Sequence, residues 1–167
     1  MELFLWRHAE AIPGIPDLER PLSRTGFRQA ESTAKWLNLV LPDDALILVS
    51  PALRTRQTAD ALGRSYTIHP DLAIDHEPRD ILRAAGWPGA NQTVVVVGHQ
   101  PTLGNVASIL MSERELEWEF ERSDVWWFVA HGVRYETADL KAVLSPSMID
   151  LLLEFRSSRS GESQKGY

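Results

Sequence analysis

Three short apolar runs stand out along the chain: Leu3 to Trp6, Ala45 to Val49 and Thr93 to Val97. None of them alternates apolar with polar residues, and the third reads TVVVV. Unbroken aliphatic and β-branched runs of this length are typical of strands buried on both faces of a sheet. The runs therefore predict central strands of a sheet that helices cover on both sides.

The segments between these runs have helical spacing. In the stretch GFRQAESTAKWLNLVL, apolar residues recur at intervals of three and four and form the stripe of an amphipathic helix. Shorter helices are predicted from Pro78 to about Ala85, with Gly86 as the stop, and from Thr102 to Met111. Strands that alternate with helices predict an α/β fold, a three-layer α/β/α sandwich around a largely parallel sheet.

The alternation of apolar runs with helical segments ends after Met111. The glutamate-rich stretch from Ser112 to Ser123 indicates a solvated helix or loop, and the segments VWWFVA and VRYETADLKAVL that follow predict a hairpin or meander at one edge of the sheet. Ser157 to Tyr167 is small, polar and without periodicity. We expect one domain over residues 1–156 followed by a disordered tail over residues 157–167.

Composition limits the classes of partner. The 167 residues carry a formal net charge of −6, which disfavours broad binding to nucleic acid or to an anionic membrane. No apolar segment approaches the ~20 residues that a membrane span needs. The absence of cysteine removes disulfides, thiolate metal sites and a cysteine nucleophile. We expect a cytoplasmic protein in which any anion site is local.

Arginine and histidine residues follow the predicted strands where each one ends. Arg7 and His8 follow the first strand, Arg54 lies one turn into a helix that Ser50 is suited to cap, and His99 follows the third strand. Taken alone, each is more simply a solvated or capping residue. The carboxyl ends of parallel strands meet at one edge of the sheet, so together they predict a cationic pocket there.

Backbone N–H groups at a helix start favour bound anions, and those of Gln100 and the following residues open the helix after the third strand. Arginine binds phosphate bidentately, one neutral histidine can attack phosphorus, and a second can stabilise the charge on its oxygens. These groups predict phosphoryl transfer through a phosphohistidine intermediate, with arginine in place of Mg²⁺ and no cofactor. His69, His76 and His131 lack regular ligand spacing, so no metal site is predicted.

The motifs RHAEA, RPLSRTGFRQA, SPALRTRQTA and VVVVGHQP occur in this order along the chain. Through them it resembles the histidine phosphatase superfamily, also called the phosphoglycerate mutase-like family, and in particular its SixA-type phosphohistidine phosphatase branch. The resemblance implies that His8 is the phosphorylated nucleophile, that Arg7 and Arg54 bind phosphate, and that His99 is the second pocket histidine. It also implies a phosphate contact for Arg20.

The resemblance leaves the general acid open. Mutase-type members carry a glutamate in the segment where this chain offers Asp75 and Glu77. Glu77 precedes Pro78 and is equally suited to cap a helix, and Glu10 or water could also serve. The residue after His8 is alanine where the family commonly has glycine, a departure that favours the SixA-like branch.

We expect a phosphohistidine-bearing protein as the substrate. Only the segment from Pro70 to Gln92 separates the second helical unit from the third strand, which leaves no room for a large lid over a metabolite. The first alternative is a phosphatase for small phosphorylated metabolites. The second is a catalytically silent phosphoprotein-binding module, against which the presence of His8 argues, since binding needs the arginines but not a nucleophile.

Overall fold

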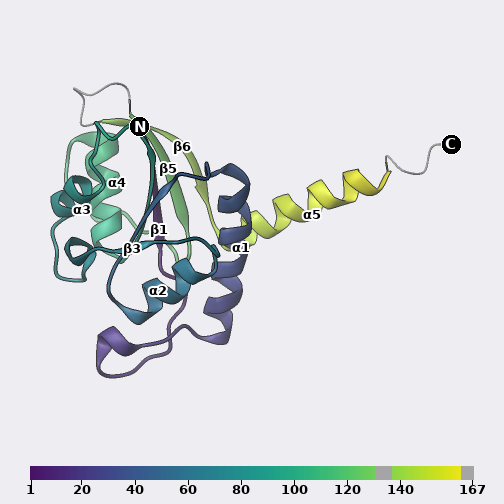
Figure 1. Ribbon diagram of the computed structural model, residues 1–167, viewed down its shortest axis with the longest axis horizontal. Helices are drawn as coiled ribbons and strands as arrows, with labels where there is room; N and C mark the ends of the chain where they lie inside the picture. The colour runs from purple at the N-terminus through teal and green to yellow at the C-terminus, as the bar shows by residue number, and fades with distance from the viewer. Residues whose placement is uncertain (131–136, 163–167) are drawn as a thin grey trace.

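The computed structural model describes residues 1–130 and 137–162, and within them the chain forms a six-stranded sheet flanked by helices (Figure 1). The strand order is β3-β2-β4-β1-β5-β6. The strands are β1 (Glu2–Arg7), β2 (Leu46–Val49), β3 (Thr67–Ile68), β4 (Thr93–Gly98), β5 (Val125–Ala130) and β6 (Ala138–Leu144). The first four run parallel, and β5 and β6 add an antiparallel pair at the β1 side.

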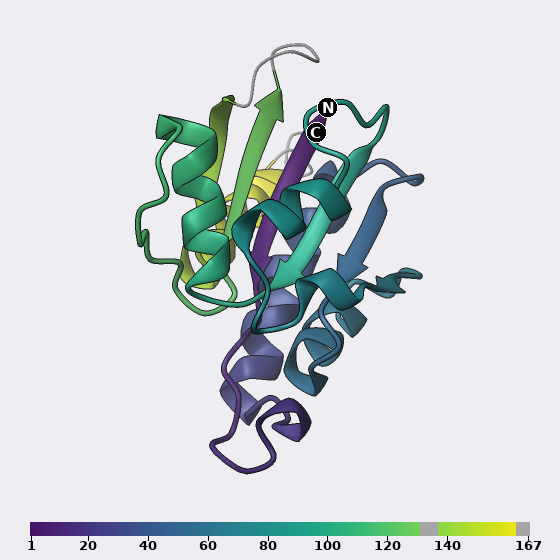
Figure 2. The same cartoon turned by 90° about the vertical axis from the view of Figure 1, so that its left-hand side faces the viewer.

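Helices cover both faces of this sheet. They are α1 (Arg24–Val40), α2 (Leu53–Asp60), α3 (Pro78–Ala84), α4 (Thr102–Ser112) and α5 (Pro146–Glu162), with short 3-10 turns η1 (Asp17–Glu19) and η2 (Pro70–Leu72). Figure 2 shows α3 and α4 on the near face and α1 behind the sheet. Along β1, Leu3 and Leu5 pack toward α3 and α4, whereas Phe4 and Trp6 pack toward α1. The predicted three-layer α/β/α sandwich is confirmed.

Most of the predicted elements lie where the sequence places them. β1, β2 and β4 occupy the three apolar runs, α1, α3 and α4 end within two residues of their predicted bounds, and β5 and β6 confirm the hairpin at the sheet edge. The predicted N-cap of α2 was wrong. Its N-cap is Ala52 instead of Ser50, because the buried Ser50 hydroxyl is hydrogen-bonded to His99 Nε2 at 2.7 Å.

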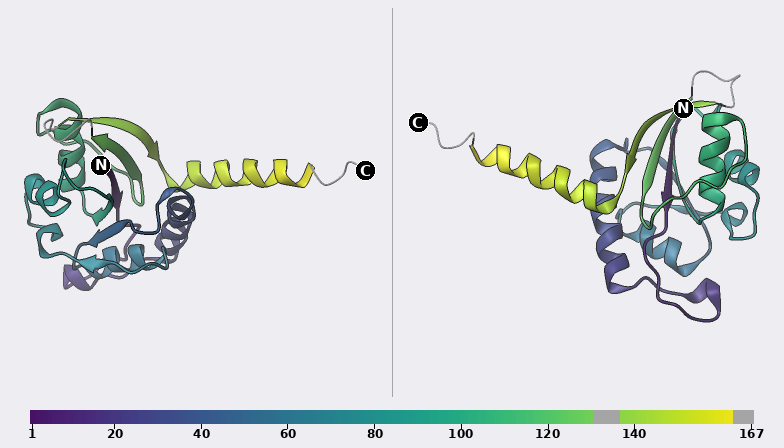
Figure 3. Two further views of the ribbon diagram at one scale, coloured as in Figure 1. Left: turned by 45° about the horizontal axis from the view of Figure 1, so that its top comes forward. Right: turned by 180° about the vertical axis from the view of Figure 1, so that it is seen from behind.

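The sequence analysis missed α5. Ile149 and Leu153 pack on the α1 side of the sheet, and beyond this contact the helix projects from the body of the molecule (Figure 3). Residues 157–162 of the predicted tail continue this helix, while residues 163–167, like His131 and the rest of 131–136, lie outside the described residues. None of the helices of the described residues is long and apolar enough to cross a membrane.

A close approach of α1 fixes the segment that follows β1. A Cβ on Gly26 would lie 2.0 Å from the Glu10 carbonyl oxygen, so only glycine fits there. The Ser23 N–H donates to that carbonyl at 2.9 Å, and Ser23 Oγ accepts from the Gly26 N–H at 3.0 Å as the helix cap. The backbone just after His8 is therefore held against the first turn of α1.

This contact predicts that Gly26→Ala lowers the free energy of unfolding by about 1–3 kcal/mol, because the added methyl group forces α1 away from the Glu10 backbone. The measurement is chemical denaturation. Gly14→Ala is the control, since a Cβ there meets nothing closer than Arg20 Cγ at 3.9 Å. Equal stability of the two variants would contradict the role assigned to the close approach.

Candidate active site

The carboxyl ends of the parallel strands open onto a cavity of about 280 Å³. Its lining residues are Arg7, His8, Ala11, Arg20, Arg54, Ile74, His99, Gln100 and Arg122. All six residues that the sequence assigns to phosphate binding or catalysis belong to this set. β1 and β4 are paired in parallel with Arg7 beside Gly98, and the His8 N–H donates to the Gly98 carbonyl at 3.0 Å. This register brings the rings of His8 and His99 to a centroid separation of 5.3 Å.

The environment of His8 leaves one ring nitrogen available for chemistry. His8 Nδ1 lies 2.7 Å from the Ala9 carbonyl oxygen. A carbonyl only accepts, so Nδ1 carries the hydrogen and Nε2 carries the lone pair. Burial, with Arg54 and Arg7 nearby, lowers the pKa of His8 to about 4. At neutral pH the ring is uncharged, and Nε2 can act as a nucleophile.

His99 is buried beside it with a different set of contacts. Burial, followed by the proximity of His8 and Arg54, lowers the pKa of His99 to about 3. Its Nε2 pairs with Ser50 Oγ, while Nδ1 has no hydrogen-bond partner in the part of the chain that the structure describes. When the Ser50 hydroxyl donates to Nε2, the hydrogen of the neutral ring is on Nδ1. His99 can then donate a hydrogen bond to an oxyanion without being charged.

Asp17, which the sequence analysis did not single out, holds two of the arginines. Arg54 is 4% exposed and donates from Nη1 to the Asp17 carbonyl at 2.7 Å and from Nη2 to Asp17 Oδ2 at 2.9 Å. Arg20 donates from Nη1 to Asp17 Oδ1 at 2.9 Å. Hydrogen bonds from Arg20 and Arg54 lower the pKa of Asp17, so this carboxylate bridges the two guanidinium groups as an anion.

Arg7 is anchored by the loop that precedes β5. Arg7 Nη1 donates to the Phe120 carbonyl. The loop is itself fixed on α4, because Gln100 Nε2 donates to the Trp118 carbonyl at 2.5 Å and a Cβ on Gly104 would lie 1.7 Å from the same oxygen. Close packing of residues far apart in the chain therefore sets the position of the Arg7 guanidinium.

Three buried nitrogen atoms of cavity-lining residues have no hydrogen-bond partner among the described residues. They are Arg7 Nε, Arg54 Nε and His99 Nδ1. A buried donor without an acceptor costs about 1–3 kcal/mol, and native proteins rarely leave several of them in one place. An oxyanion bound in the cavity would provide acceptors for the guanidinium and imidazole groups that line it. The arrangement is therefore suited to a tetrahedral phosphoryl group.

The candidate acids do not line this cavity. Glu77 is the N-cap of α3, where its N–H donates to Asp80 Oδ2 at 3.2 Å, and the neighbouring segment reaches the cavity through Ile74 rather than Asp75. Glu10 does not line the cavity either, and its two carboxylate oxygens accept hydrogen bonds from Ser23 Oγ and from Arg122 Nη1. No group of three His, Asp or Glu side chains among the described residues could hold a metal ion.

Two residues of the site escaped the sequence analysis for different reasons: Arg122, which lines the cavity, and Asp17, which holds two of the lining arginines. Asp17 lies three residues before Arg20, a spacing that could have indicated the ion pair between them, but nothing local links it to Arg54. Arg122 lies 112 residues from its partner Glu10, to which it donates from Nη1 at 3.1 Å. A contact of that separation has no signal in a single sequence.

The family model for the histidine phosphatase superfamily, branch 1, matches residues 3–79. This chain belongs to the histidine phosphatase superfamily. This histidine phosphatase is 36% identical over 110 residues to an uncharacterised protein of Mycobacterium tuberculosis, covering 64% of this chain and 70% of the relative. Over 120 residues it is 28% identical to phosphohistidine phosphatase SixA of Escherichia coli, covering 66% and 74% of the two chains.

Its fold is similar to that of a candidate SixA phosphohistidine phosphatase from Nakamurella multipartitia, with a TM-score of 0.73 and 28% identity. The superposition covers 87% of this chain and 95% of that one. The SixA-type resemblance drawn from the four motifs is therefore confirmed at the level of sequence and of fold. The histidine phosphatase fold accounts for the meeting of Arg7, His8, Arg54 and His99 at one end of the sheet.

The lowered pKa values predict that His8 and His99 stay neutral well below the ordinary range of histidine. Nitrogen-detected NMR of the imidazole rings should show both neutral at pH 5.5, with protonation only as the pH falls toward 4. The unfolded chain takes up these protons near pH 6.5, so the free energy of unfolding should decrease on acidification from pH 6.5 to 4. Titration of His8 near pH 6.5 would be the contrary result.

The bridge made by Asp17 predicts that Asp17→Asn lowers kcat/KM about tenfold, which corresponds to ~1.4 kcal/mol. Asparagine keeps an acceptor oxygen but loses the charge that fixes both Arg20 and Arg54. The measurement is steady-state hydrolysis of p-nitrophenyl phosphate, with Asp43→Asn, an exposed position outside the cavity, as control. An unchanged kcat/KM would show that Asp17 does not position the arginines.

Proposed function

We propose that this protein is a metal-independent phosphatase that hydrolyses protein phosphohistidine through a covalent intermediate on His8. One observation carries the proposal. Three unpartnered buried nitrogens and the lone pair of a neutral histidine belong to residues that line one small cavity. Groups that hold an oxyanion are thereby combined with a nucleophile of suitable charge state.

The first step is in-line attack of His8 Nε2 on phosphorus. The bond from Nε2 to phosphorus forms, and the bond from phosphorus to the leaving atom breaks with its electron pair on that atom. Arg7 and Arg54 donate to the phosphoryl oxygens from their free Nε atoms, His99 donates from Nδ1, and Arg20 adds positive charge at the rim. These contacts stabilise the charge of the transition state.

Water completes the reaction. It attacks phosphorus from the side that the leaving group has vacated, the phosphorus bond to Nε2 breaks, and inorganic phosphate leaves. His8 returns to its neutral form with the hydrogen still on Nδ1. The positive charge for both steps comes from arginine side chains. Gln100 also lines the cavity, and its side chain holds the loop before β5 through the Trp118 carbonyl.

The leaving group favours phosphohistidine over a phosphomonoester. An imidazole nitrogen is protonated near neutral pH and can depart without a strong acid, whereas an alkoxide needs a proton donor. None of the nine lining residues is a carboxylic acid. The first alternative, a small-metabolite phosphatase, needs an acid that protonates the leaving oxygen, and we would assign this role to Glu77 or Asp75. Either residue would have to move toward the cavity to act.

The short segment between α2 and β4 also supports a protein substrate. Within it the structure has β3, η2 and α3, and only Ile74 of this segment lines the cavity. A phosphohistidine side chain on another protein can reach the cavity only where no large segment covers its entrance. SixA of Escherichia coli, which shares 28% identity, is named for phosphohistidine hydrolysis. The second alternative, a non-catalytic phosphoprotein-binding module, would have no use for the exposed lone pair on His8.

The prediction is that purified protein, in excess chelator, removes phosphate from a phosphohistidine-bearing phosphotransfer protein in preference to a panel of phosphomonoesters. His8→Ala should reduce the rate roughly a thousandfold or more, because it removes the nucleophile. Mixtures quenched with alkaline denaturant, which preserves the acid-labile phosphorus–nitrogen bond, and analysed by mass spectrometry should show transient phosphate on His8. His76→Ala, which lies outside the cavity, is the matched control and should retain full activity.

The other outcomes separate the alternatives. Fast hydrolysis of a phosphomonoester with intact phosphohistidine would identify a metabolite phosphatase of the same mechanism. Binding of the phosphoprotein without turnover would identify a binding module. Wild-type activity in His8→Ala would overturn the mechanism itself.

A further inference from the structure

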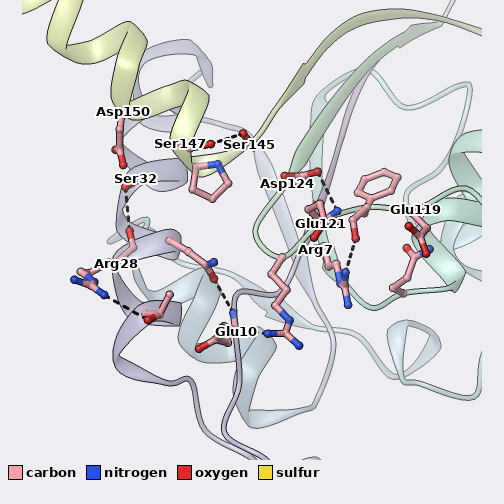
Figure 4. Close-up of a pocket in the computed structure, with 16 residues that line it drawn as sticks. Arg7, Glu10, Arg28, Ser32, Glu119, Glu121, Asp124, Ser145, Ser147 and Asp150 are labelled. Carbon is pink, nitrogen blue, oxygen red and sulfur yellow. Dashed lines mark hydrogen bonds and ion pairs between the residues drawn. The ribbon is translucent and has the colours of Figure 1, made fainter.

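A second and larger hollow adjoins the catalytic cavity (Figure 4). Its volume is about 1030 Å³, against about 280 Å³ for the cavity, and Arg7, Gln100 and Arg122 line both. Its walls are the first turns of α1, the start of α5 and the loop before β5, and we call this hollow the α1/α5 groove. A phosphoryl group fills only the smaller cavity, so whatever carries that group can extend into the groove.

The boundary between cavity and groove is an ion pair. Arg122 Nη1 lies 3.1 Å from Glu10 Oε2, and the other oxygen of Glu10 accepts from Ser23 Oγ at 2.6 Å. Glu10 is thereby fixed to α1, and Arg122 reaches it from the loop before β5. The two charges offset each other, so the rim itself contributes little net charge to a ligand that crosses it.

The remaining charge of the groove is mostly negative. Its lining includes five carboxylates and three arginines. Arg7 is directed to the Phe120 carbonyl and Arg122 to Glu10, which leaves Arg28 as the third. On the acidic side, Glu119, Glu121 and Asp150 are exposed, and none of the ion pairs among the described residues involves them.

A buried acid in the same lining independently indicates a ligand. Asp124 is 7% exposed, and its Oδ2 accepts from the Glu121 N–H at 3.0 Å. Its Oδ1 has no hydrogen-bond partner among the described residues. A buried carboxylate oxygen without a donor is costly, and a donor entering the groove beside Glu121 would reduce that cost.

We propose that the α1/α5 groove binds the polypeptide segment on either side of the substrate's phosphohistidine and selects segments with lysine or arginine near that residue. This inference rests on the proposed function and adds the substrate's recognition features to it. Glu119, Glu121 and Asp150 attract the basic side chains of the segment, and Asp124 accepts a hydrogen bond from it. The same carboxylates repel a small polyanionic metabolite, which has no chain to place in the groove.

The test uses two synthetic peptides of one length that carry phosphohistidine, one flanked by lysines and one by glutamates, with p-nitrophenyl phosphate as a substrate too small for the groove. For the wild type we expect kcat/KM to be at least about tenfold higher for the lysine-flanked peptide. The double variant Glu121→Lys with Asp150→Lys should lose this preference. Its kcat/KM for p-nitrophenyl phosphate should stay within about twofold of the wild type.

The matched control is Glu117→Lys with Glu154→Lys. It changes the net charge by the same amount, on the same loop and on the same helix, at exposed positions that do not line the groove. It should keep the preference for the lysine-flanked peptide. Thermal unfolding of both double variants confirms that each is folded.

Equal kcat/KM for the two peptides in the wild type would overturn the groove assignment while leaving the phosphohistidine phosphatase in place. A preference that survives Glu121→Lys with Asp150→Lys, or disappears equally in the control, would do the same. Turnover of p-nitrophenyl phosphate without turnover of either peptide would overturn the protein phosphohistidine substrate, and the groove assignment with it.

Discussion

The hydrogen bond from the His8 N–H to the Gly98 carbonyl sets the geometry on which the site depends. It continues the parallel ladder of β1 and β4 one residue past the strands, so the two histidines leave the sheet side by side. A slip of one residue in this register would send one ring to the opposite face of the sheet. The buried packing of both strands, with Leu3 to Trp6 fully covered, is what prevents such a slip.

The charges near the site are arranged in two zones with opposite roles. Around the cavity, burial above all, together with the neighbouring arginines, lowers the pKa of both histidines and keeps them neutral, which suits a nucleophile and a hydrogen-bond donor. Asp17 offsets part of the positive charge and aligns Arg20 and Arg54 at the same time. The lining of the α1/α5 groove is mostly negative, in contrast to the positive lining of the cavity. The Arg122–Glu10 ion pair lies where the two zones meet.

The parts of the structure that the sequence predicts are those with local signals. Apolar runs mark β1, β2 and β4, and the side chains directly after them, His8 and His99, must emerge at one edge of a parallel sheet. The contacts of Asp17 with Arg54, Ser50 with His99 and Arg122 with Glu10 span 37, 49 and 112 residues. Tertiary packing brings the two residues of each contact together. No periodicity or spacing in a single sequence indicates contacts between residues so far apart.

The hydrogen bond from His8 Nδ1 to the Ala9 carbonyl has a consequence for the second half of the proposed reaction. Once Nε2 carries the phosphoryl group, Nδ1 keeps its hydrogen and the ring becomes a cation. When the phosphorus bond breaks, this cation releases a neutral imidazole, which departs far more readily than the imidazolate anion that would leave if Nδ1 carried no hydrogen. The bond that selects the attacking nitrogen thus also makes the enzyme's own histidine a good leaving group, without any rotation of the ring between the two steps.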